Sequence, residues 1–254
     1  MFRVFIPARY DSQRLPGKPL LPIAGQPMIQ HVYERAAASG AAQVVVVTDD
    51  ERIAGAVADF GGEVLMTGSH HRSGTERIAE AVDALGLDAS EVIVNLQGDE
   101  PTMPAALIDQ CAALLDDDQA DIATLASPFL THEDFVNPNC VKVIRDEHDH
   151  AIYFSRAAIP YARDAGKQER AAGIALHHHG IYAYRCGVLR QFVAASASPL
   201  EVSEQLEQLR ALSLGMTIVV GVPACRPGIG VDTATDLERA ASELESLEKN
   251  NIFK

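Results

Sequence analysis

The stretch that decides the fold is VVVVTDD, which runs from Val44 to Asp50. Its four consecutive valines favour a strand, and an unbroken apolar run is typical of a strand covered on both faces. Such strands belong to parallel sheets with helices on each side. The two aspartates form a polar tail at the carboxyl end of this strand.

The same alternation extends outward from this strand through the first half of the chain. Apolar segments alternate with segments of helical periodicity, which predicts right-handed crossovers and a mostly parallel sheet. Ligands of such sheets bind beyond the carboxyl ends of the strands. The other predicted strands are Phe2–Pro7, 63–67 and 91–101, and the predicted helices run from Met28 to Gly40, Glu51 to Phe60, Thr75 to Leu85 and Pro104 to Leu115.

The pattern changes after about Ala120, where shorter and more antiparallel strands are predicted. These strands lie at 121–128, 140–146, 151–156 and 180–185, and two helices follow at Leu200–Leu214 and Thr233–Lys249. No low-complexity linker separates the halves. We therefore expect one α/β domain over 1–254, with a half of about 1–120 and a second half of about 121–254.

Charge and composition narrow the class of protein. The formal net charge is −14, which argues against binding to nucleic acid or to an anionic membrane surface. No apolar run approaches the roughly 20 residues that cross a bilayer, and residues 1–30 lack a signal-peptide pattern. The four cysteines contain no C-x-x-C pair and indicate small, mostly buried thiols. A cytoplasmic enzyme or binding protein fits best.

Cations gather in the loop after the first strand, within IPARYDSQRLPGKPLLPIAGQPMI (Ile6–Ile29). The loop matches neither a Walker A motif nor a dinucleotide fingerprint. It nevertheless has the ingredients of a phosphate site, because Arg9 and Arg14 can bind phosphate bidentately and Lys18 adds a point charge. A local positive patch on an acidic protein suits a small, highly charged anion. The alternative is a solvated surface loop.

At this point the chain resembles the nucleotidyltransferases that activate acidic sugars with CTP, and most of all those that act on 3-deoxy-manno-octulosonate (Kdo). The resemblance covers nearly the whole chain in order. Besides the opening loop it rests on HRSGTER (71–77), VNLQGDEP (94–101), NPNCVKV (137–143), YFSRAAIP (153–160), HHGIYAYR (178–185), SPLEVSEQLEQLR (198–210) and GVDTATDLER (230–239). It implies a Rossmann-like nucleotidyltransferase fold with a nucleotide-binding first half and a sugar-binding and dimerisation second half.

The resemblance implies which residues hold CTP. The opening loop wraps the triphosphate, Lys18 stabilises charge that develops during transfer, and the loop at 73–77 contacts the base, the ribose and the phosphates. Ser73 or Thr75 could instead simply cap the helix that follows. The implied nucleotide-binding residues are Ala8, Arg9, Arg14, Lys18, Ser73, Gly74 and Arg77.

A magnesium site is suggested by QGDEP, which presents Asp99 at the end of a buried strand behind a glycine. Alone, this aspartate is more simply a helix cap or a turn residue. The resemblance pairs it with Asp232 and makes the two the Mg²⁺ ligands, although Asp232 could instead cap the helix from Thr233. The implied catalytic residues are Lys18, Asp99 and Asp232.

The sugar pocket is implied by resemblance alone. A sugar with a carboxylate and many hydroxyls needs one cation and several polar groups, and each candidate also has a structural explanation. Within the run His177–His179 the rings alternate between faces, which makes a poor metal cage. The implied residues are Gln97, Arg156, His178, Tyr182, Glu207 and Gln208.

The implied reaction is cytidylyl transfer from CTP to Kdo with release of pyrophosphate, which activates the sugar for lipopolysaccharide biosynthesis. Members of this group are commonly homodimers, and the 151–160 region offers apolar positions for an interface. Three alternatives stay open: the same chemistry on another acidic sugar, a metal-dependent glycosyltransferase, and a nucleotide-binding regulatory protein without turnover.

Overall fold

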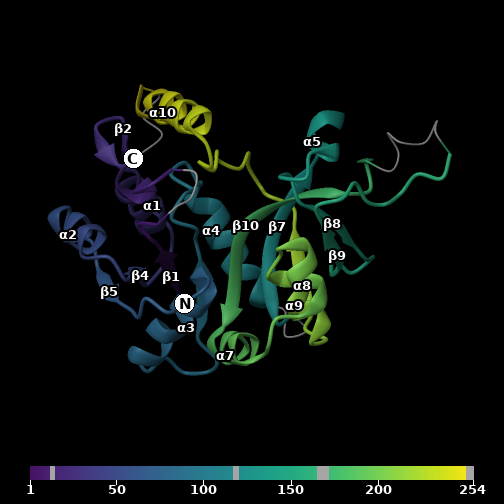
Figure 1. The fold of residues 1–254 in the computed structure, drawn as a ribbon, viewed down its shortest axis with the longest axis horizontal. Helices are drawn as coiled ribbons and strands as arrows, with labels where there is room; N and C mark the ends of the chain where they lie inside the picture. The colour runs from purple at the N-terminus through teal and green to yellow at the C-terminus, as the bar shows by residue number, and fades with distance from the viewer. Residues whose placement is uncertain (12–14, 117–119, 165–171, 250–254) are drawn as a thin grey trace.

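A computed structural model describes residues 1–11, 15–116, 120–164 and 172–249. Its main sheet has the strand order β11-β7-β10-β6-β1-β4-β5, and β8 and β9 extend it from β10 (Figure 1). Strands from both halves of the chain therefore form one sheet. The strands are β1 Phe2–Pro7, β4 Gln43–Thr48, β5 Val64–Met66, β6 Val92–Asn95, β7 Ile122–Pro128, β8 Lys142–Arg145, β9 Ala151–Ser155, β10 Leu176–Arg185 and β11 Ile218–Gly221, with a small hairpin of β2 Pro22–Ile23 and β3 Gln26–Pro27.

The pairing confirms the α/β fold with a mostly parallel centre. β1 pairs in parallel with β4 and β6, and β4 pairs in parallel with β5. β10 runs antiparallel to both β6 and β7, so it joins the two halves. The helices are α1 Met28–Ala37, α2 Glu51–Asp59, α3 Gly74–Ala84, α4 Ala105–Ala113, α5 His132–Val136, α7 Cys186–Ala194, α8 Pro199–Glu204, α9 Gln208–Ser213 and α10 Ala234–Lys249, with 3-10 turns η1 Lys18–Leu20 and η2 Leu114–Asp116.

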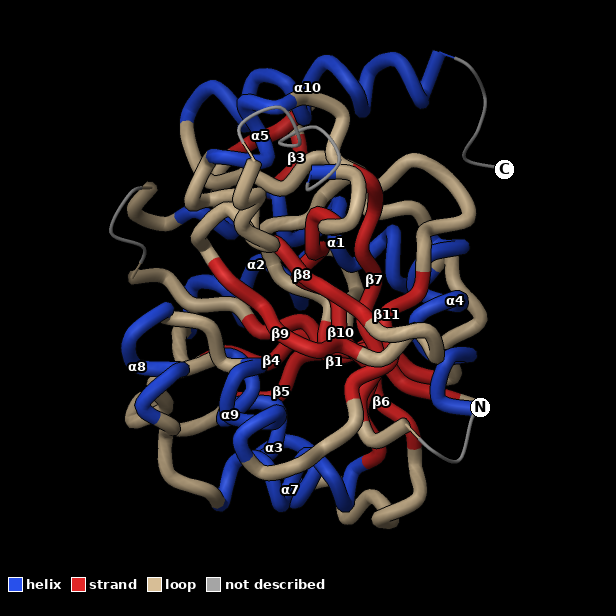
Figure 2. The backbone as a smooth tube through the Cα atoms, turned by 90° about the vertical axis from the view of Figure 1, so that its right-hand side faces the viewer, coloured by secondary structure: helices blue, strands red, loops and turns tan. Residues whose placement is uncertain are grey.

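The strand predicted from the four valines is buried on both faces. Val44 and Val46 belong to the core under α1, α2 and α4, whereas Val45 and Val47 belong to the core under α3 and α7. The alternation follows from the two-residue period of a strand. Figure 2 shows the result as a layer of strands between layers of helices. None of the helices in the described parts of the chain is both long and apolar enough to cross a membrane.

The second half departs from the prediction in several places, including the short helix α5, which was not predicted. The helix predicted over Leu200–Leu214 is two short helices, α8 and α9, because Gln205 takes a left-handed backbone conformation with φ 54° and ends α8. Helix α7 and strand β11 were not predicted. β11 pairs with β7 in parallel, so this half is less uniformly antiparallel than expected.

The C-terminal helix α10 lies over the hairpin of β2 and β3 at one end of the molecule (Figure 1). Ala240 and Leu244 of α10 pack with Ile23, Met28 and Val231 in a small separate core. This packing brings the segment before α10 back to the opening loop, where the candidate site lies.

Candidate active site

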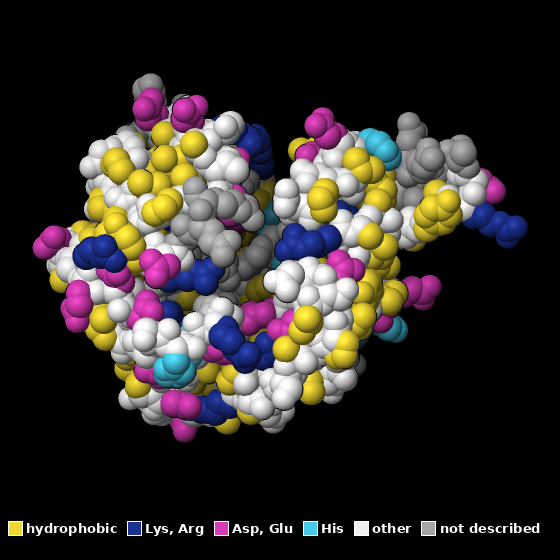
Figure 3. Space-filling model, viewed as in Figure 1, with side chains coloured by type: hydrophobic (Ala, Val, Ile, Leu, Met, Phe, Trp, Pro, Cys, Tyr) yellow, Lys and Arg dark blue, Asp and Glu magenta, His cyan; other side chains and the backbone are white. Residues whose placement is uncertain are grey.

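A cavity of about 460 Å³ opens at the carboxyl ends of β1 and β6. Because these two strands are parallel neighbours, their ends meet at one edge of the sheet. Figure 3 shows the molecule hollowed between its two sides, with Lys and Arg side chains near the hollow. The cavity is lined by Pro7, Ala8, Arg9, Lys18, Pro19, Met28, His71, Arg72, Ser73, Gly74, Arg77, Gln97, Gly98, Asp99 and Asp232.

Three predicted catalytic side chains meet at this cavity. The Lys18 ammonium lies 2.6 Å from an oxygen of Asp99 and 3.4 Å from an oxygen of Asp232. The Lys18 side chain is only 10% exposed, whereas that of Asp232 is 65% exposed. A nearly buried cation thus lies between two carboxylates that still reach solvent.

The backbone explains why residues so distant in sequence meet. The Val231 amide donates to the Asp99 carbonyl at 2.9 Å, which lays the 231–232 segment beside the end of β6. A Cβ on Gly98 would lie 2.8 Å from the Pro7 carbonyl oxygen, so only glycine allows the β6 tail to approach β1 this closely. Thr233, not Asp232, caps α10 by accepting from the Asp236 amide.

The opening loop is held by its own packing. Gly17 has φ 69°, and its amide donates to the Tyr10 carbonyl at 3.0 Å. The Tyr10 ring lies over Gly17, and a Cβ on Gly17 would come within 3.1 Å of this ring. The guanidinium carbon of Arg52, which belongs to α2, lies 3.3 Å from the centroid of the Tyr10 ring. These contacts place Lys18 at the start of η1. Arg9 lines the cavity from an exposed position, and Arg14 lies outside the described residues.

Carboxyl groups gather around Lys18. Burial, followed by the charge of Asp99, raises the pKa of Glu100 to about 8, and Lys18 opposes the rise. Glu100 is therefore largely protonated near pH 7, whereas Asp99 and Asp232 both contact the Lys18 ammonium. Two carboxylates that converge on one point attract positive charge there.

The predicted base-binding loop forms the N-terminus of α3. Ser73 caps the helix, because its hydroxyl accepts from the Glu76 amide at 3.2 Å. The buried Arg77 guanidinium donates to the Thr67 hydroxyl at 2.6 Å and lies 3.2 Å from an Asp49 oxygen. Arg72 is mostly exposed and pairs with Glu76 at 3.2 Å.

Two of the predicted sugar-binding residues, His178 and Tyr182, lie together on β10, and a third, Gln97, lies near Tyr182. Tyr182 pairs with Asn95 in the sheet, and its ring centroid is 5.2 Å from that of His178. Gln97 reaches the same edge and donates to the Asn95 side chain at 3.2 Å. The Tyr182 hydroxyl is buried and has no hydrogen-bond partner among the described residues.

The remaining sugar candidates lie at or beside the turn between α8 and α9: Glu207 and Gln208 belong to this region, and Arg156, which follows β9, contacts it. Glu207 accepts from the Thr75 hydroxyl at 2.7 Å and lines a second cavity of about 250 Å³, which shares Arg72 and Ser73 with the first. Gln208 is buried at the start of α9. The Arg156 guanidinium donates to the carbonyls of Pro138, Glu204 and Gln205 at 3.1, 2.7 and 3.3 Å.

Comparison with known proteins decides the family. A family model described as "Cytidylyltransferase" matches residues 4–218. The chain belongs to the cytidylyltransferase family. Two curated relatives, from Idiomarina loihiensis and Halorhodospira halophila, are each 53% identical to it and are named 3-deoxy-manno-octulosonate cytidylyltransferase. The alignments cover 94% and 96% of this chain and 96% and 97% of the relatives.

Solved structures agree with this assignment. A CMP:2-keto-3-deoxy-manno-octonic acid synthetase complexed with CTP superposes with a TM-score of 0.87 at 41% identity, covering 97% of this chain and 99% of that one. A cytidylyltransferase from Leptospira borgpetersenii superposes with a TM-score of 0.59 over 98% of this chain and 94% of that one. At 17% identity, that second likeness concerns the fold alone.

One buried cation of this cytidylyltransferase, which supports a candidate site residue, was not predicted from the sequence. The Lys142 side chain is fully buried, and its ammonium donates to the carbonyls of Asn137, Cys140 and Arg156 at 2.9, 2.8 and 2.6 Å. The Lys142 ammonium thereby links the backbone of the 137–140 loop to the backbone of Arg156. A lysine between two valines, Val141 and Val143, in a predicted strand was the signal that could have revealed it.

The three consecutive histidines make separate contacts. His177 stacks on Phe129, and His179 lies 2.9 Å from the Ser127 hydroxyl. His178 lies 3.0 Å from the Thr124 hydroxyl, and burial lowers its pKa to about 3. The His178 ring is therefore neutral near pH 7 and can donate or accept hydrogen bonds without carrying charge.

Proposed function

We propose that this chain transfers the cytidylyl group of CTP to Kdo and releases pyrophosphate, which supplies activated sugar for lipopolysaccharide biosynthesis. The observation that carries the proposal is the meeting of Lys18, Asp99 and Asp232 at one cavity. The names of the two relatives, together with the CTP bound to the similar solved structure, support the choice of substrates.

The first cavity is the proposed CTP site. Arg9 and Lys18 supply positive charge for the triphosphate, and Arg14 is assigned the same role from outside the described residues. Arg77 adds charge to the wall, where Asp49 and Thr67 hold it. The remaining proposed nucleotide contacts are Ala8, Ser73 and Gly74, all in the cavity lining.

We assign Mg²⁺ to Asp99 and Asp232. The residues fit the ion, because an ammonium group already lies between the two carboxylates. Carboxylate oxygens are ligands that Mg²⁺ prefers. When bound, the ion supplies charge neutralisation and polarises oxygens of the reacting groups.

Positioning and charge stabilisation account for the proposed catalysis. The anomeric hydroxyl of the sugar attacks the α-phosphorus of CTP in line, and pyrophosphate leaves. We assign Lys18 to the phosphate oxygens on which negative charge increases, so that its ammonium stabilises the transition state more than the bound substrate. We assign no side chain as a dedicated general base.

The sugar is proposed to bind beside Tyr182. A buried hydroxyl without a partner carries a desolvation cost that a polar ligand removes. The Arg156 hydrogen bonds to carbonyl oxygens orient the guanidinium without neutralising its charge, so it suits the sugar carboxylate. The further proposed polar contacts are Gln97, His178, Glu207 and Gln208.

Replacing Tyr182 by Phe separates sugar binding from stability. We expect the KM for the sugar to rise about 3- to 10-fold, because one neutral hydrogen bond is worth roughly 0.5–1.5 kcal/mol. The free energy of unfolding should stay unchanged or rise by up to about 1 kcal/mol, since an unpaired buried hydroxyl is removed. Steady-state kinetics and urea denaturation measure the two effects.

Tyr33 provides the matched control on α1. Its hydroxyl accepts from the Glu63 amide at 3.3 Å, so Tyr33→Phe removes a partnered hydroxyl away from the cavity lining. We expect this variant to lose stability and to keep the wild-type KM. A Tyr182→Phe variant that loses stability and binds sugar normally would contradict the sugar assignment.

The reaction itself is tested by pyrophosphate release. Purified protein is incubated with CTP and Mg²⁺ and with Kdo, its 8-amino analogue, a sialic acid or no sugar. We expect sugar-dependent release that is fastest with Kdo, accompanied by an equal amount of CMP-sugar. Faster release with another sugar would reassign the substrate, and no release with any sugar would reject the transfer reaction.

We propose that the enzyme is a homodimer joined through the β8–β9 side. Ile152, Tyr161 and Ile174 are 59%, 89% and 51% exposed, and together they offer apolar surface for an interface on this side. Sedimentation velocity should show a dimer that Ile152→Glu weakens. A wild-type monomer at tens of micromolar would contradict this arrangement.

We place the reaction in the cytoplasm, where CTP is available. All four cysteines are free thiols, which suits a reducing compartment. Cell fractionation tests the assignment, and activity confined to a membrane or exported fraction would contradict it.

A further inference from the structure

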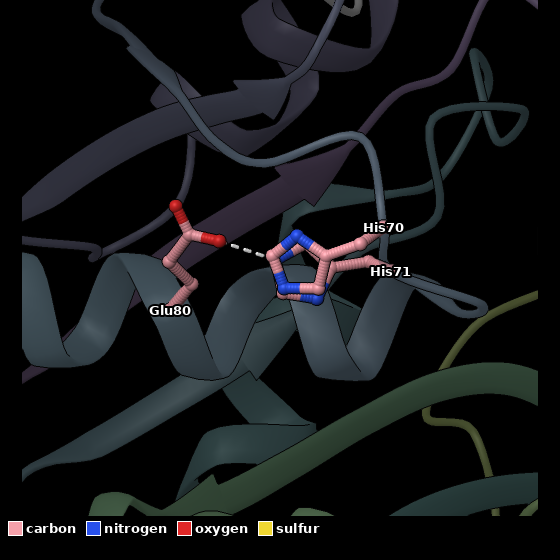
Figure 4. Close-up of side chains that lie close together, drawn as sticks. All are labelled: His70, His71 and Glu80. Carbon is pink, nitrogen blue, oxygen red and sulfur yellow. Dashed lines mark hydrogen bonds and ion pairs between the residues drawn. The ribbon is translucent and has the colours of Figure 1, made fainter.

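Two histidines and a glutamate gather at the rim of the cavity. His70 and His71 lie in the loop after β5, and Glu80 projects from α3 toward the same point (Figure 4). One nitrogen or oxygen atom from each lies within 4.8 Å of the other two. Within the described ranges, this is the one group of three His, Cys, Asp or Glu side chains with that spacing.

The two rings face Glu80 together. A nitrogen of His71 directly contacts a Glu80 carboxylate oxygen. The ring centroids of His70 and His71 are 4.2 Å apart, and Figure 4 shows one ring over the other on the carboxylate side of α3. Imidazole nitrogens are the commonest protein ligands of transition metals, and two of them lie side by side here.

Backbone groups hold the carboxylate and the loop in place. The Gly68 amide donates to the two Glu80 oxygens at 3.1 and 3.2 Å. A Cβ on Gly68 would lie 2.5 Å from the His70 ring, so glycine lets that ring approach the loop closely. A ligating carboxylate is commonly oriented by such a hydrogen bond from outside the metal shell.

We propose that His70, His71 and Glu80 bind a divalent transition metal of the Zn²⁺ type. Two imidazoles, one carboxylate and a solvent position make a four-coordinate site that Zn²⁺ accepts. Mg²⁺ prefers oxygen ligands in an octahedron and does not match this set. The site is therefore chemically distinct from the carboxylate pair of Asp99 and Asp232.

Only small adjustments bring the three groups into ligand positions. Metal–ligand bonds of about 2.0–2.2 Å require ligand atoms roughly 3.3–3.5 Å apart in a tetrahedron. His71 and Glu80 already touch, and the exposed His70 is free of core packing that would oppose a rotation. His71 also lines the first cavity, so the bound metal would fix the loop that precedes Ser73.

The test is calorimetric titration of the metal-free protein with Zn²⁺ in millimolar Mg²⁺, which fills the carboxylate pair. We expect one equivalent to bind with a micromolar Kd. His70→Ala and Glu80→Gln should each weaken binding at least about 10-fold, because each removes one of three ligands. Titration with Co²⁺ should give the visible absorption of a four-coordinate ion, and both variants should lose it.

Controls separate this site from other histidines. His148 is exposed in the β8–β9 turn, and His148→Ala should bind Zn²⁺ within twofold of the wild type. Thermal melting of the metal-free variants checks that they are folded. A wild-type protein that binds no stoichiometric Zn²⁺, or a folded His70→Ala variant with unchanged affinity, would overturn the proposal.

Discussion

Replacing Asp99 by Asn is expected to lower kcat by about 10³-fold or more at saturating substrates. The change keeps the size of the side chain but removes one of two carboxylates that meet at Lys18. The proposed Mg²⁺ then has a single charged protein ligand, and the charge that develops on the reacting phosphate is less well stabilised. CTP binding should survive in part, because the opening loop and the loop at 71–74 are unchanged.

Pyrophosphate release across a Mg²⁺ titration measures the effect, and calorimetry measures the remaining CTP affinity. Asp83→Asn is the matched control, because Asp83 also pairs with a cation, Arg190 at 2.7 Å, but does not line the cavity. We expect that control to keep a wild-type kcat. A wild-type rate for Asp99→Asn at saturating Mg²⁺ would rule out the metal assignment.

Replacing Lys18 by Met should lower kcat/KM about 10- to 150-fold. A hydrogen bond to a charged group contributes roughly 1.5–3 kcal/mol, and in this enzyme it is proposed to strengthen in the transition state. Most of the loss should therefore fall on kcat and not on the KM for CTP. Methionine retains the apolar length of the nearly buried side chain, so the protein should stay folded.

Steady-state kinetics with CTP and sugar varied separately give the division between kcat and KM. Arg190→Met is a suitable control. Arg190 belongs to α7 and pairs with Asp83, but it does not line the cavity. If Lys18→Met raised only the KM for CTP and left kcat intact, Lys18 would be a binding residue without a role in stabilising the transition state.

The first half of the fold could be predicted because local pattern and tertiary role agree there. The four valines at 44–47 make both faces of the strand apolar, and in the structure each face is covered by one of the two hydrophobic cores. In the second half this agreement weakens. Gln205 breaks a segment whose periodicity favours one helix over 200–214, and nothing in its side chain demands a left-handed backbone.

Some residues of the candidate site could be predicted from residue type alone, whereas others could be predicted only from the family resemblance. Residue types alone drew attention to the cationic loop, and the structure places Arg9 and Lys18 of that loop in the cavity lining; their binding of phosphate stays a prediction. The pairing of Asp99 with Asp232 came from resemblance, since it depends on the backbone bond between Val231 and Asp99, and no spacing rule encodes that bond.

Three features were absent from the sequence argument because they depend on packing in three dimensions. Lys142 is a structural cation only because three carbonyls turn toward it. The orphaned hydroxyl of Tyr182 depends on how β10 inserts between β6 and β7. Glu80 joins the adjacent pair His70 and His71 through the path of the loop onto α3.

We propose that Lys18 occupies the position between Asp99 and Asp232 that a divalent cation takes during the reaction. The Mn²⁺ affinity of the nucleotide-free protein, measured by electron paramagnetic resonance, tests this proposal. We expect Lys18→Met to bind Mn²⁺ about 10-fold more tightly than the wild type, because the competing ammonium is gone, and Asp232→Asn to bind it more weakly. Equal Mn²⁺ affinity in the wild type and both variants would show that the ammonium and the divalent cation do not share this position.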